Sequence, residues 1–249
     1  MKKHQNILMM KRIKKILSHI EKTPFHPQWL IFRKTDVSLS NIAKLSKDKI
    51  LDIGCGHQKI RNYLAQECDY TGLDYYKTAI EWYGSKPHVY ADAEVLPFDK
   101  DTMKTVLLLD VLEHLPNPEI CIREVYRVLQ PGGNCIVQVP FLYPLHDEPL
   151  DFHRWTRWGL HKIFENSGFN VNEIVPYGKA YETGSLLFIL GMCKSVLDWW
   201  RKPSLLLIIS PLIIVVIPVI NLIAALISIF EKDQGFMPYS YFCVLIKPD

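Results

Sequence analysis

Between residues 49 and 177, short apolar runs alternate with stretches of helical periodicity, and this alternation restricts the possible fold more than any other feature. Such a pattern is typical of βαβ units, which build a parallel sheet with helices on its faces. A chain of 249 residues is long enough to bury one such core. We therefore predict an α/β domain with strands at 49–53, 70–73, 89–91, 105–109, 134–139 and 169–175.

Residues with known capping preferences mark the ends of the intervening helices. Asn117 can cap a helix that has Pro118 at its first position, and residues 131–133, Pro-Gly-Gly, are expected to end that helix before the next strand. Thr156 similarly opens a helix that Gly168 closes. The pattern therefore predicts helices between the later strands.

The first predicted strand runs into Gly54, Cys55 and Gly56, and a helical pattern begins at His57. Two glycines allow the backbone to approach a ligand closely, and the N-terminus of a helix would add N–H donors and a partial positive charge. This turn is therefore a candidate ligand-binding loop.

Asp74 ends the second predicted strand, 18 residues after Gly56. A carboxylate at that place can accept hydrogen bonds from both hydroxyls of a ribose, in a nicotinamide or in an S-adenosylmethionine cofactor. Lys59 or Ile60 occupies the place of the third glycine, so the full dinucleotide-binding fingerprint is absent. These residues predict adenosine binding, but they do not decide between a nicotinamide cofactor and S-adenosylmethionine.

Five motifs together make the chain resemble the class I methyltransferases, in particular the group that shares the "methyltransferase type 11" domain. The resemblance covers about residues 48–178 in the family's order and spacing. It implies a Rossmann-like, mostly parallel seven-stranded sheet with an antiparallel last strand, and S-adenosylmethionine as the cofactor. The motifs are residues 50–56 (ILDIGCG), 70–74 (YTGLD), 91–98 (ADAEVLPF), 110–115 (DVLEHL) and 124–133.

The resemblance also implies which residues bind the cofactor. Residues 54–56 would line its methionine part, with Asp52 below the ammonium group. Asp74 would hold the ribose, with Tyr75 beside it. Acidic side chains suit a cationic sulfonium, whereas a phosphate cradle would be rich in Arg or Lys.

By the same resemblance, Asp92 would accept a hydrogen bond from the adenine amino group, with Ala93 beside it. Leu109 and Asp110 would line the cofactor near the reacting centre. For Asp110 and Asp52 a second interpretation stays open, namely that each carboxylate only caps the end of its strand.

Methyl transfer from a sulfonium is an in-line displacement, so positioning of the acceptor supplies most of the catalysis. A general base helps when the acceptor is a hydroxyl, and an imidazole titrates near neutral pH. His114 and His146 are therefore the predicted catalytic residues. The alternative for His114 is a structural histidine at the start of the helix after the fourth strand.

The loop 141–149 follows the fifth predicted strand, at the sheet edge where ligands of such folds bind. It predicts contact with the substrate, although a merely structural loop remains the alternative. Metal binding is conceivable for a set of acids and imidazoles in this region, but their spacing follows no established metal site and no metal is predicted; these residues are His146, Asp147, Glu148, Asp151 and His153. The predicted substrate-binding residues are Tyr143, His146, Asp151, His153 and Arg154.

Residues 204–230 hold 27 residues without one charge. As one helix they would be about 40 Å long, more than the roughly 30 Å of a hydrocarbon core.

The final strand, 239–247, is expected beside strand five with 169–175 as its other neighbour, so the chain must cross any bilayer an even number of times. We expect a hairpin broken at Pro211 or Pro218 that enters one leaflet, or helices that lie in the interface. A soluble helical subdomain, a dimer interface or two spans that include 184–200 are the alternatives.

The first 22 residues place Ile13, Ile16, Leu17 and Ile20 on one helical stripe, with lysines and arginines largely off it. This predicts a basic amphipathic helix that attaches to an anionic membrane surface or covers the domain. The predicted organisation is therefore an N-terminal helix at 1–30, the methyltransferase domain at 31–180 and 236–249, and an apolar, membrane-associating helical insertion at 181–235.

The net charge of +3 is too small to indicate nucleic-acid binding, and the six cysteines are scattered without a CxxC pair, as expected in a reducing compartment.

We therefore predict an S-adenosylmethionine-dependent methyltransferase at the cytoplasmic face of a membrane. Its acceptor is expected to be small or lipid-linked: a sugar, a quinone or a lipid headgroup. The alternatives are a non-catalytic, membrane-associated S-adenosylmethionine-binding scaffold and a nicotinamide oxidoreductase. The oligomeric state is left open.

Overall fold

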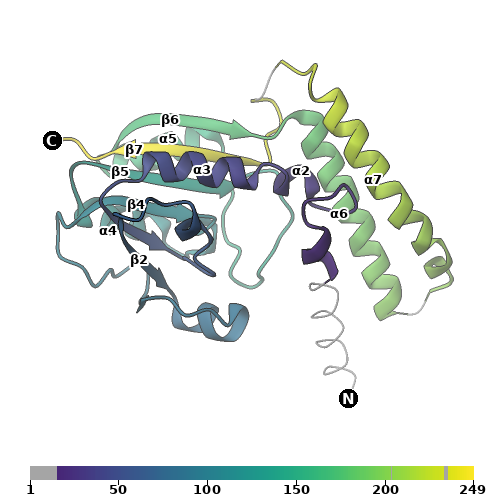
Figure 1. Ribbon diagram of the computed structural model, residues 1–249, viewed down its shortest axis with the longest axis horizontal. Helices are drawn as coiled ribbons and strands as arrows, with labels where there is room; N and C mark the ends of the chain where they lie inside the picture. The colour runs from purple at the N-terminus through teal and green to yellow at the C-terminus, as the bar shows by residue number, and fades with distance from the viewer. Residues whose placement is uncertain (1–15, 203, 233–234) are drawn as a thin grey trace. The chain divides into compact units, whose positions relative to one another are not determined.

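The computed structural model describes residues 16–202, 204–232 and 235–249, and these form two compact units (Figure 1). The sheet unit comprises Val37–Tyr177 with Pro238–Asp249. The helical unit comprises the residues up to Asp36 with Gly178–Met237.

The sheet unit is built on seven strands in the order β3-β2-β1-β4-β5-β7-β6. The first five strands are parallel, and β7 lies antiparallel between β5 and β6. The predicted fold class, including the antiparallel last strand, is confirmed. The strands are β1 (Lys49–Ile53), β2 (Asp69–Asp74), β3 (Val89–Tyr90), β4 (Met103–Leu109), β5 (Leu129–Pro140), β6 (Asn170–Tyr177) and β7 (Ser240–Ile246).

Alternation of side chains along the strands gives this sheet two covered faces. Leu51 and Ile53 of β1 pack in a cluster with α4 (Pro118–Val128) and α5 (Arg157–Asn166). Ile50, which precedes Leu51, packs on the other face with Ile42 of α3 (Thr35–Leu45) and with Ile60 of η1 (Lys59–Asn62). A sheet covered on both faces leaves the ends of its strands as the natural place for a site.

The predicted helix ends are confirmed at three of four places. Asn117 precedes α4, Thr156 caps α5 by accepting a hydrogen bond from the Gly159 N–H, and Gly168 follows α5 with φ +91°. The prediction for residues 131–133 was wrong: α4 already ends at Val128, and Pro-Gly-Gly lies in an irregular first part of β5. There the register against β4 shifts, which the left-handed backbone of Gly132 (φ +64°) permits.

The helical unit contains α2 (Trp29–Phe32), α6 (Ala180–Arg201), η4 (Leu205–Ile209) and α7 (Ser210–Ile227), with α6 and α7 packed side by side (Figure 1). The predicted break at a proline was wrong. Pro211 lies in the first turn of α7, where a missing N–H leaves no helical bond unmade, and α7 continues through Pro218. The helical pair is therefore α6 and α7 rather than two halves of the apolar run.

Buried polar contacts hold the helical unit together. The Glu182 carboxylate of α6 is 1% exposed and forms ion pairs with Arg33 and Lys34. The Asn221 amide of α7 donates to the backbone carbonyls of Pro24 and His26 at 2.7 and 3.1 Å. Residues 16–20 are helical, as predicted for the N-terminal segment, but residues 21–28 form turns and bends, so the predicted continuous helix at 1–30 was wrong there; residues 1–15 lie outside the described residues.

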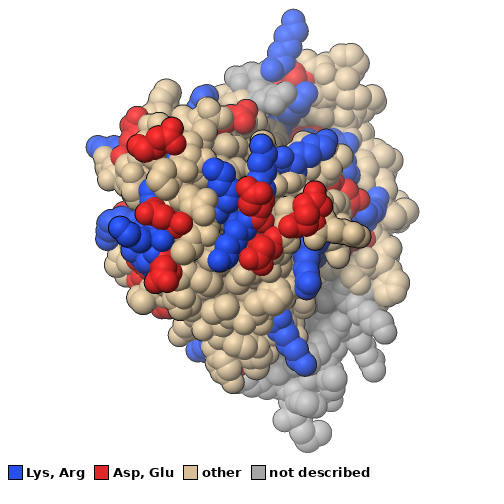
Figure 2. Space-filling view, turned by 60° about the vertical axis from the view of Figure 1, so that its left-hand side comes forward, with Lys and Arg blue, Asp and Glu red and all other residues tan. Residues whose placement is uncertain are grey.

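Charged side chains are interspersed by sign on the face that Figure 2 shows, where described Lys and Arg residues lie among Asp and Glu residues. That mixture agrees with the small net charge of +3.

Candidate active site

The turn after β1 depends on Gly54, whose φ of +67° is a left-handed conformation. A Cβ at this position would lie 2.5 Å from Cγ2 of Val111, so glycine is required by both backbone and space. Gly56 also has a positive φ, +47°, but open space lies where its Cβ would be. The turn therefore presents bare backbone beside Gly56, as a ligand-binding loop needs.

No α-helix begins at His57, so that prediction was wrong. Gln58 has left-handed backbone angles, and only the four-residue 3-10 turn η1 follows. Two left-handed residues that flank His57, Gly56 and Gln58, turn the chain too sharply for an α-helix to start there. The N–H groups of Cys55 and Gly56 in the turn donate to the Leu73 carbonyl and the Asp74 carboxylate, so they tie the turn to β2.

Asp74, at the end of β2, ties the two strand ends together. Its Oδ2 accepts a hydrogen bond from the Gly56 N–H at 2.9 Å, and its Oδ1 accepts from the Tyr75 N–H at 2.8 Å and the Thr78 hydroxyl at 3.0 Å. A carboxylate can accept about four hydrogen bonds, so capacity remains for a ribose hydroxyl. The Tyr75 side chain is exposed beside it.

Asp52 is a buried acid, 3% exposed, whose Oδ2 accepts a hydrogen bond from the Tyr70 hydroxyl at 2.6 Å. Burial raises the pKa of Asp52 to about 7, the bond from Tyr70 opposes the rise, and the charge of Asp74 adds to it. Such a carboxyl gains most from a nearby cation, which fits the ammonium and sulfonium of S-adenosylmethionine.

The remaining predicted cofactor residues lie at the ends of the neighbouring strands. The Ala91 N–H donates to the Asp74 carbonyl at 3.1 Å, which brings the exposed Asp92 next to the glycine turn, while Ala93 is buried in the core. Leu109 ends β4, and Asp110 follows it with φ +57°, accepting a bond from the Gln138 amide at 2.8 Å. Gly54, Asp74 and Asp92 therefore share one edge of the sheet.

The loop after β5 is held by an ion pair. Arg154 binds Asp151 through two nitrogens, at 2.6 and 2.8 Å, and Asp151 also accepts the His146 N–H at 2.9 Å. Burial opposes ionisation, but these contacts hold the pKa of Asp151 at about 2. Asp151 and Arg154 thus position His146, and their contact with a substrate stays a prediction.

Aromatic contacts pack the rest of this loop. Tyr143 meets the His146 ring edge to face at 5.3 Å, and burial raises the pKa of its hydroxyl to about 12. His153 stacks on Trp155 at 5.2 Å. The Tyr83 hydroxyl, from the π-helical segment η2 (Thr78–Tyr83), donates to Asp147 at 2.8 Å and so links this loop to the chain after β2.

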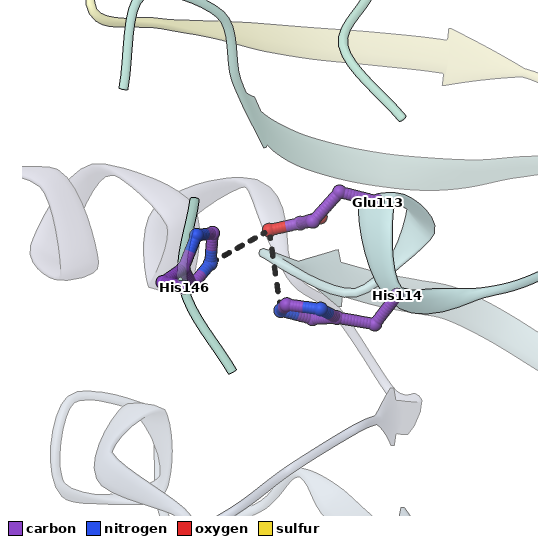
Figure 3. A group of neighbouring side chains, drawn as sticks. All are labelled: Glu113, His114 and His146. Atoms are coloured by element: carbon purple, nitrogen blue, oxygen red, sulfur yellow. Dashed lines mark ion pairs between the residues drawn. The ribbon is translucent and has the colours of Figure 1, made fainter. Parts of the chain in front are cut away.

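Both predicted catalytic histidines lie beside Glu113, which the sequence analysis did not single out (Figure 3). Nε2 of His114 is 3.7 Å and Nε2 of His146 is 3.9 Å from Oε1 of Glu113. The available signal was the Glu113-His114 pair in the motif after β4, but its meeting with His146, 32 residues later, depends on the loop conformation. The five residues weighed for a metal do not form this group, since His146 alone belongs to both sets.

Known proteins match the part of the chain that carries this geometry. The model of the family described as "Methyltransferase domain" matches residues 51–137. A fatty-acid O-methyltransferase of Mycolicibacterium smegmatis is 31% identical over 124 residues, 46% of this chain and 43% of that protein. The phthiotriol/phenolphthiotriol dimycocerosates methyltransferase of Mycobacterium leprae is 33% identical over 99 residues, 36% of this chain and 37% of that protein. The match thus spans about two fifths of these relatives.

The crystal structure of an S-adenosylmethionine-dependent methyltransferase from Archaeoglobus fulgidus shares the fold. It has 17% sequence identity and a TM-score of 0.54, over 88% of this chain and 94% of that one. The acidic strand ends and the glycine turn fit the cofactor of that fold. Residues 51–137 therefore match a methyltransferase-domain family, and the sheet unit has the fold of S-adenosylmethionine-dependent methyltransferases.

Proposed function

We propose that the chain transfers a methyl group from S-adenosylmethionine to a small or lipid-linked acceptor, such as a sugar, a quinone or a lipid headgroup, at the cytoplasmic face of a membrane. One observation carries this proposal: a methyltransferase sheet and a long, exposed apolar helix occur in one chain. The names of two similar proteins, a fatty-acid and a phthiotriol-type methyltransferase, support an acceptor of lipid character.

The surface of α7 supports membrane association. Among the described residues, Leu205–Ile227 is the one helical stretch long and apolar enough to span a bilayer, and only 11% of its most apolar window is buried. Leu212, Val215 and Val219 lie on one side of α7 and are each more than half exposed. Soluble surfaces rarely carry so large a continuous apolar area.

The connection to the sheet favours a helix that lies in the interface over one that crosses. The two ends of the insertion meet where the Tyr239 N–H donates to the Tyr177 carbonyl at 2.9 Å, so both must stay on one side of a bilayer. A single crossing by α7 would separate them. Crossing by α6 as well would bury the exposed charges of Lys194 and Asp198.

Two further features agree with attachment to the cytoplasmic face. Residues 199–202, Trp-Trp-Arg-Lys, end α6 with the aromatic and basic side chains that prefer the headgroup region. All six cysteines are free thiols, as expected on a reducing side.

Bound S-adenosylmethionine would supply a methyl group on a good leaving group, so the chain's task is placement. Asp74 and Asp92 would hold the adenosine, Asp52 would favour the positive charge, and the Gly54 turn would fix the methionine part. A hydroxyl acceptor must also lose a proton, and the polar groups near Asp110 that can assist are those around His114 and His146.

Calorimetry tests the cofactor, with Asp74→Ala expected to lose S-adenosylmethionine binding and the exposed Asp99→Ala expected to keep it. Release of S-adenosylhomocysteine is then measured with a membrane lipid extract as the source of acceptor. Extract-dependent release supports the proposed enzyme. Cofactor binding without release would indicate the scaffold alternative, and binding of a nicotinamide instead would indicate the oxidoreductase.

A further inference from the structure

Glu113 is a buried carboxyl group without a hydrogen-bond partner. Its side chain is 0% exposed, and neither carboxylate oxygen has a partner among the described residues. Buried polar groups are almost always paired, since removing one from water without compensation is costly. A buried, unpaired acid beside the cofactor edge therefore requires a ligand or a proton.

A ring nitrogen of each neighbouring imidazole is directed toward a carboxylate oxygen of Glu113 (Figure 3). Nδ1 of His114 lies 2.8 Å from the Leu150 carbonyl, and Nδ1 of His146 lies 3.3 Å from both Asp151 Oδ2 and the Pro144 carbonyl. A nitrogen that faces an acceptor carries the hydrogen, so Nε2 of a neutral His114 holds the lone pair; for His146, the two acceptors at 3.3 Å favour the same tautomer over the longer contact of Nδ1 with Arg154 Nη2 at 3.5 Å. At 3.7 and 3.9 Å from Oε1 of Glu113, these nitrogens are too far away for hydrogen bonds.

We propose that Glu113, His114 and His146 bind a divalent transition-metal ion such as Zn²⁺. Two imidazoles and a carboxylate suit Zn²⁺, Fe²⁺ or Co²⁺, whereas Mg²⁺ and Ca²⁺ prefer oxygen ligands. Ligand atoms at about 2.1 Å from one ion lie up to about 4.2 Å apart, which the distances to Glu113 satisfy. The donor atoms all lie within 4.8 Å of one another, so a small side-chain rotation completes the set.

The surroundings of the three ligands resemble those of metal sites. Metal-binding histidines usually donate their other N–H to a carbonyl or a carboxylate, as His114 does to Leu150 and as His146 is placed to do to Asp151. Arg154 in turn fixes Asp151 through two bonds. The orientation of both rings is therefore set before any ion binds.

The ion's role in catalysis rests on the proposed function. Three protein ligands leave a coordination position for the oxygen of a hydroxyl acceptor, and a bound divalent ion lowers the pKa of such a hydroxyl. His114 and His146 then act as ligands rather than as the general bases that the sequence predicted.

Zn²⁺ titration of the full chain without a histidine tag tests the site, in the absence of S-adenosylmethionine. We expect one Zn²⁺ per chain by calorimetry, visible absorption when Co²⁺ replaces it, and no binding of Mg²⁺. His146→Ala and Glu113→Gln should each weaken Zn²⁺ binding by about tenfold or more. His161→Ala removes an exposed imidazole paired with Glu165 and should change nothing.

Two results would overturn the metal site. One is an intact chain that binds no Zn²⁺, and the other is His146→Ala that binds it unchanged, which would place the ion elsewhere, for example at a thiol. His146 lies on a loop and is partly exposed, so this variant tests the site even if Glu113→Gln fails to fold. Failure of cofactor binding would defeat the proposed function without affecting the Zn²⁺ result.

Discussion

The sheet unit and the helical unit differ in whether their buried acids form ion pairs with Lys or Arg. In the helical unit, Glu182 is buried between Arg33 and Lys34. In the sheet unit, Asp52 and Glu113 are equally buried, and among the described residues no Lys or Arg forms an ion pair with either. Removing one partner of a buried ion pair is strongly destabilising, whereas a buried acid without a cationic partner is a candidate for ligand binding.

The two units also differ in their apolar surface. Both faces of the sheet are covered by helices or turns of its own unit, while α7 leaves most of its apolar side chains exposed. Among the described residues, the sheet unit thus buries its apolar faces within itself, whereas the helical unit carries an exposed apolar helix.

The largest expected effect is on membrane binding. Changing Leu212, Val215 and Val219 to Gln removes one exposed apolar side of α7 and should weaken binding to anionic vesicles by about 5 kcal/mol, more than a thousandfold. Co-sedimentation with vesicles measures this.

The matched control changes equally exposed apolar residues of the sheet unit, Val37, Val95 and Trp158, to Gln. Equal losses from both triple variants would contradict the assignment of membrane binding to α7.

The second effect concerns the pH dependence of the cofactor-free sheet unit. The pKa of Asp52 is about 7 in the folded chain, above its ordinary value of 3.8. The free energy of unfolding is therefore highest while this carboxyl is protonated, and it falls as the pH rises through 7. Asp52→Asn should therefore exceed the unmodified chain in stability by about 4 kcal/mol at pH 8.5 and match it near pH 4. Urea unfolding at both values tests this, and a gain independent of pH would refute the unpaired-acid interpretation.

The third effect has the opposite sign. Burial acts to raise the pKa of Glu182, but Lys34 and Arg33 hold it below its usual range, so its contribution is present above the ordinary pKa of a glutamate and is lost on acidification. Glu182→Gln should cost about 3 kcal/mol at pH 7 and less at pH 4. Hydrogen exchange of the α6 amides measures this locally.

The exposed pair Lys194–Asp198 on the same helix provides the control for Glu182. Asp198→Asn should leave amide exchange in α6 nearly unchanged, because solvent screens that pair. If both variants changed amide exchange to the same extent, Glu182 would contribute no more to the local stability of α6 than an exposed charge does.

The smallest effect separates two glycines. Gly54→Ala places a Cβ 2.5 Å from Val111 at a left-handed position and should destabilise the sheet unit by about 2 kcal/mol, with loss of S-adenosylmethionine binding. Gly184→Ala in α6 meets open space and should stabilise by about 0.5 kcal/mol. Thermal unfolding and calorimetry distinguish the two. Retained cofactor binding in Gly54→Ala would exclude the turn from the site.

Sequence reasoning was most successful where one local rule decided the structure. The range 49–53 matches β1 because a central parallel strand is mostly apolar, here through Ile50, Leu51 and Ile53, and is bounded by Asp48 and Gly54. It failed where distant contacts decided the outcome, as at Pro218, which the packed α7 tolerates.

The same limit applies to the site. Gly54, Asp74 and Asp92 follow from strand ends, and their shared edge of the sheet was predictable. The position of Glu113 beside His146 was not, because it depends on how the loop 141–156 folds back through its Asp151–Arg154 pair.

The place of β7 sets an order of events during synthesis. This strand pairs with β5 on one side and β6 on the other, yet it follows the entire helical insertion in sequence. While the ribosome is producing α6 and α7, β5 still has an open edge and β6 has no neighbour to pair with. The apolar helix therefore leaves the ribosome before the sheet can close, and any surface that covers this helix can do so before the sheet unit is complete.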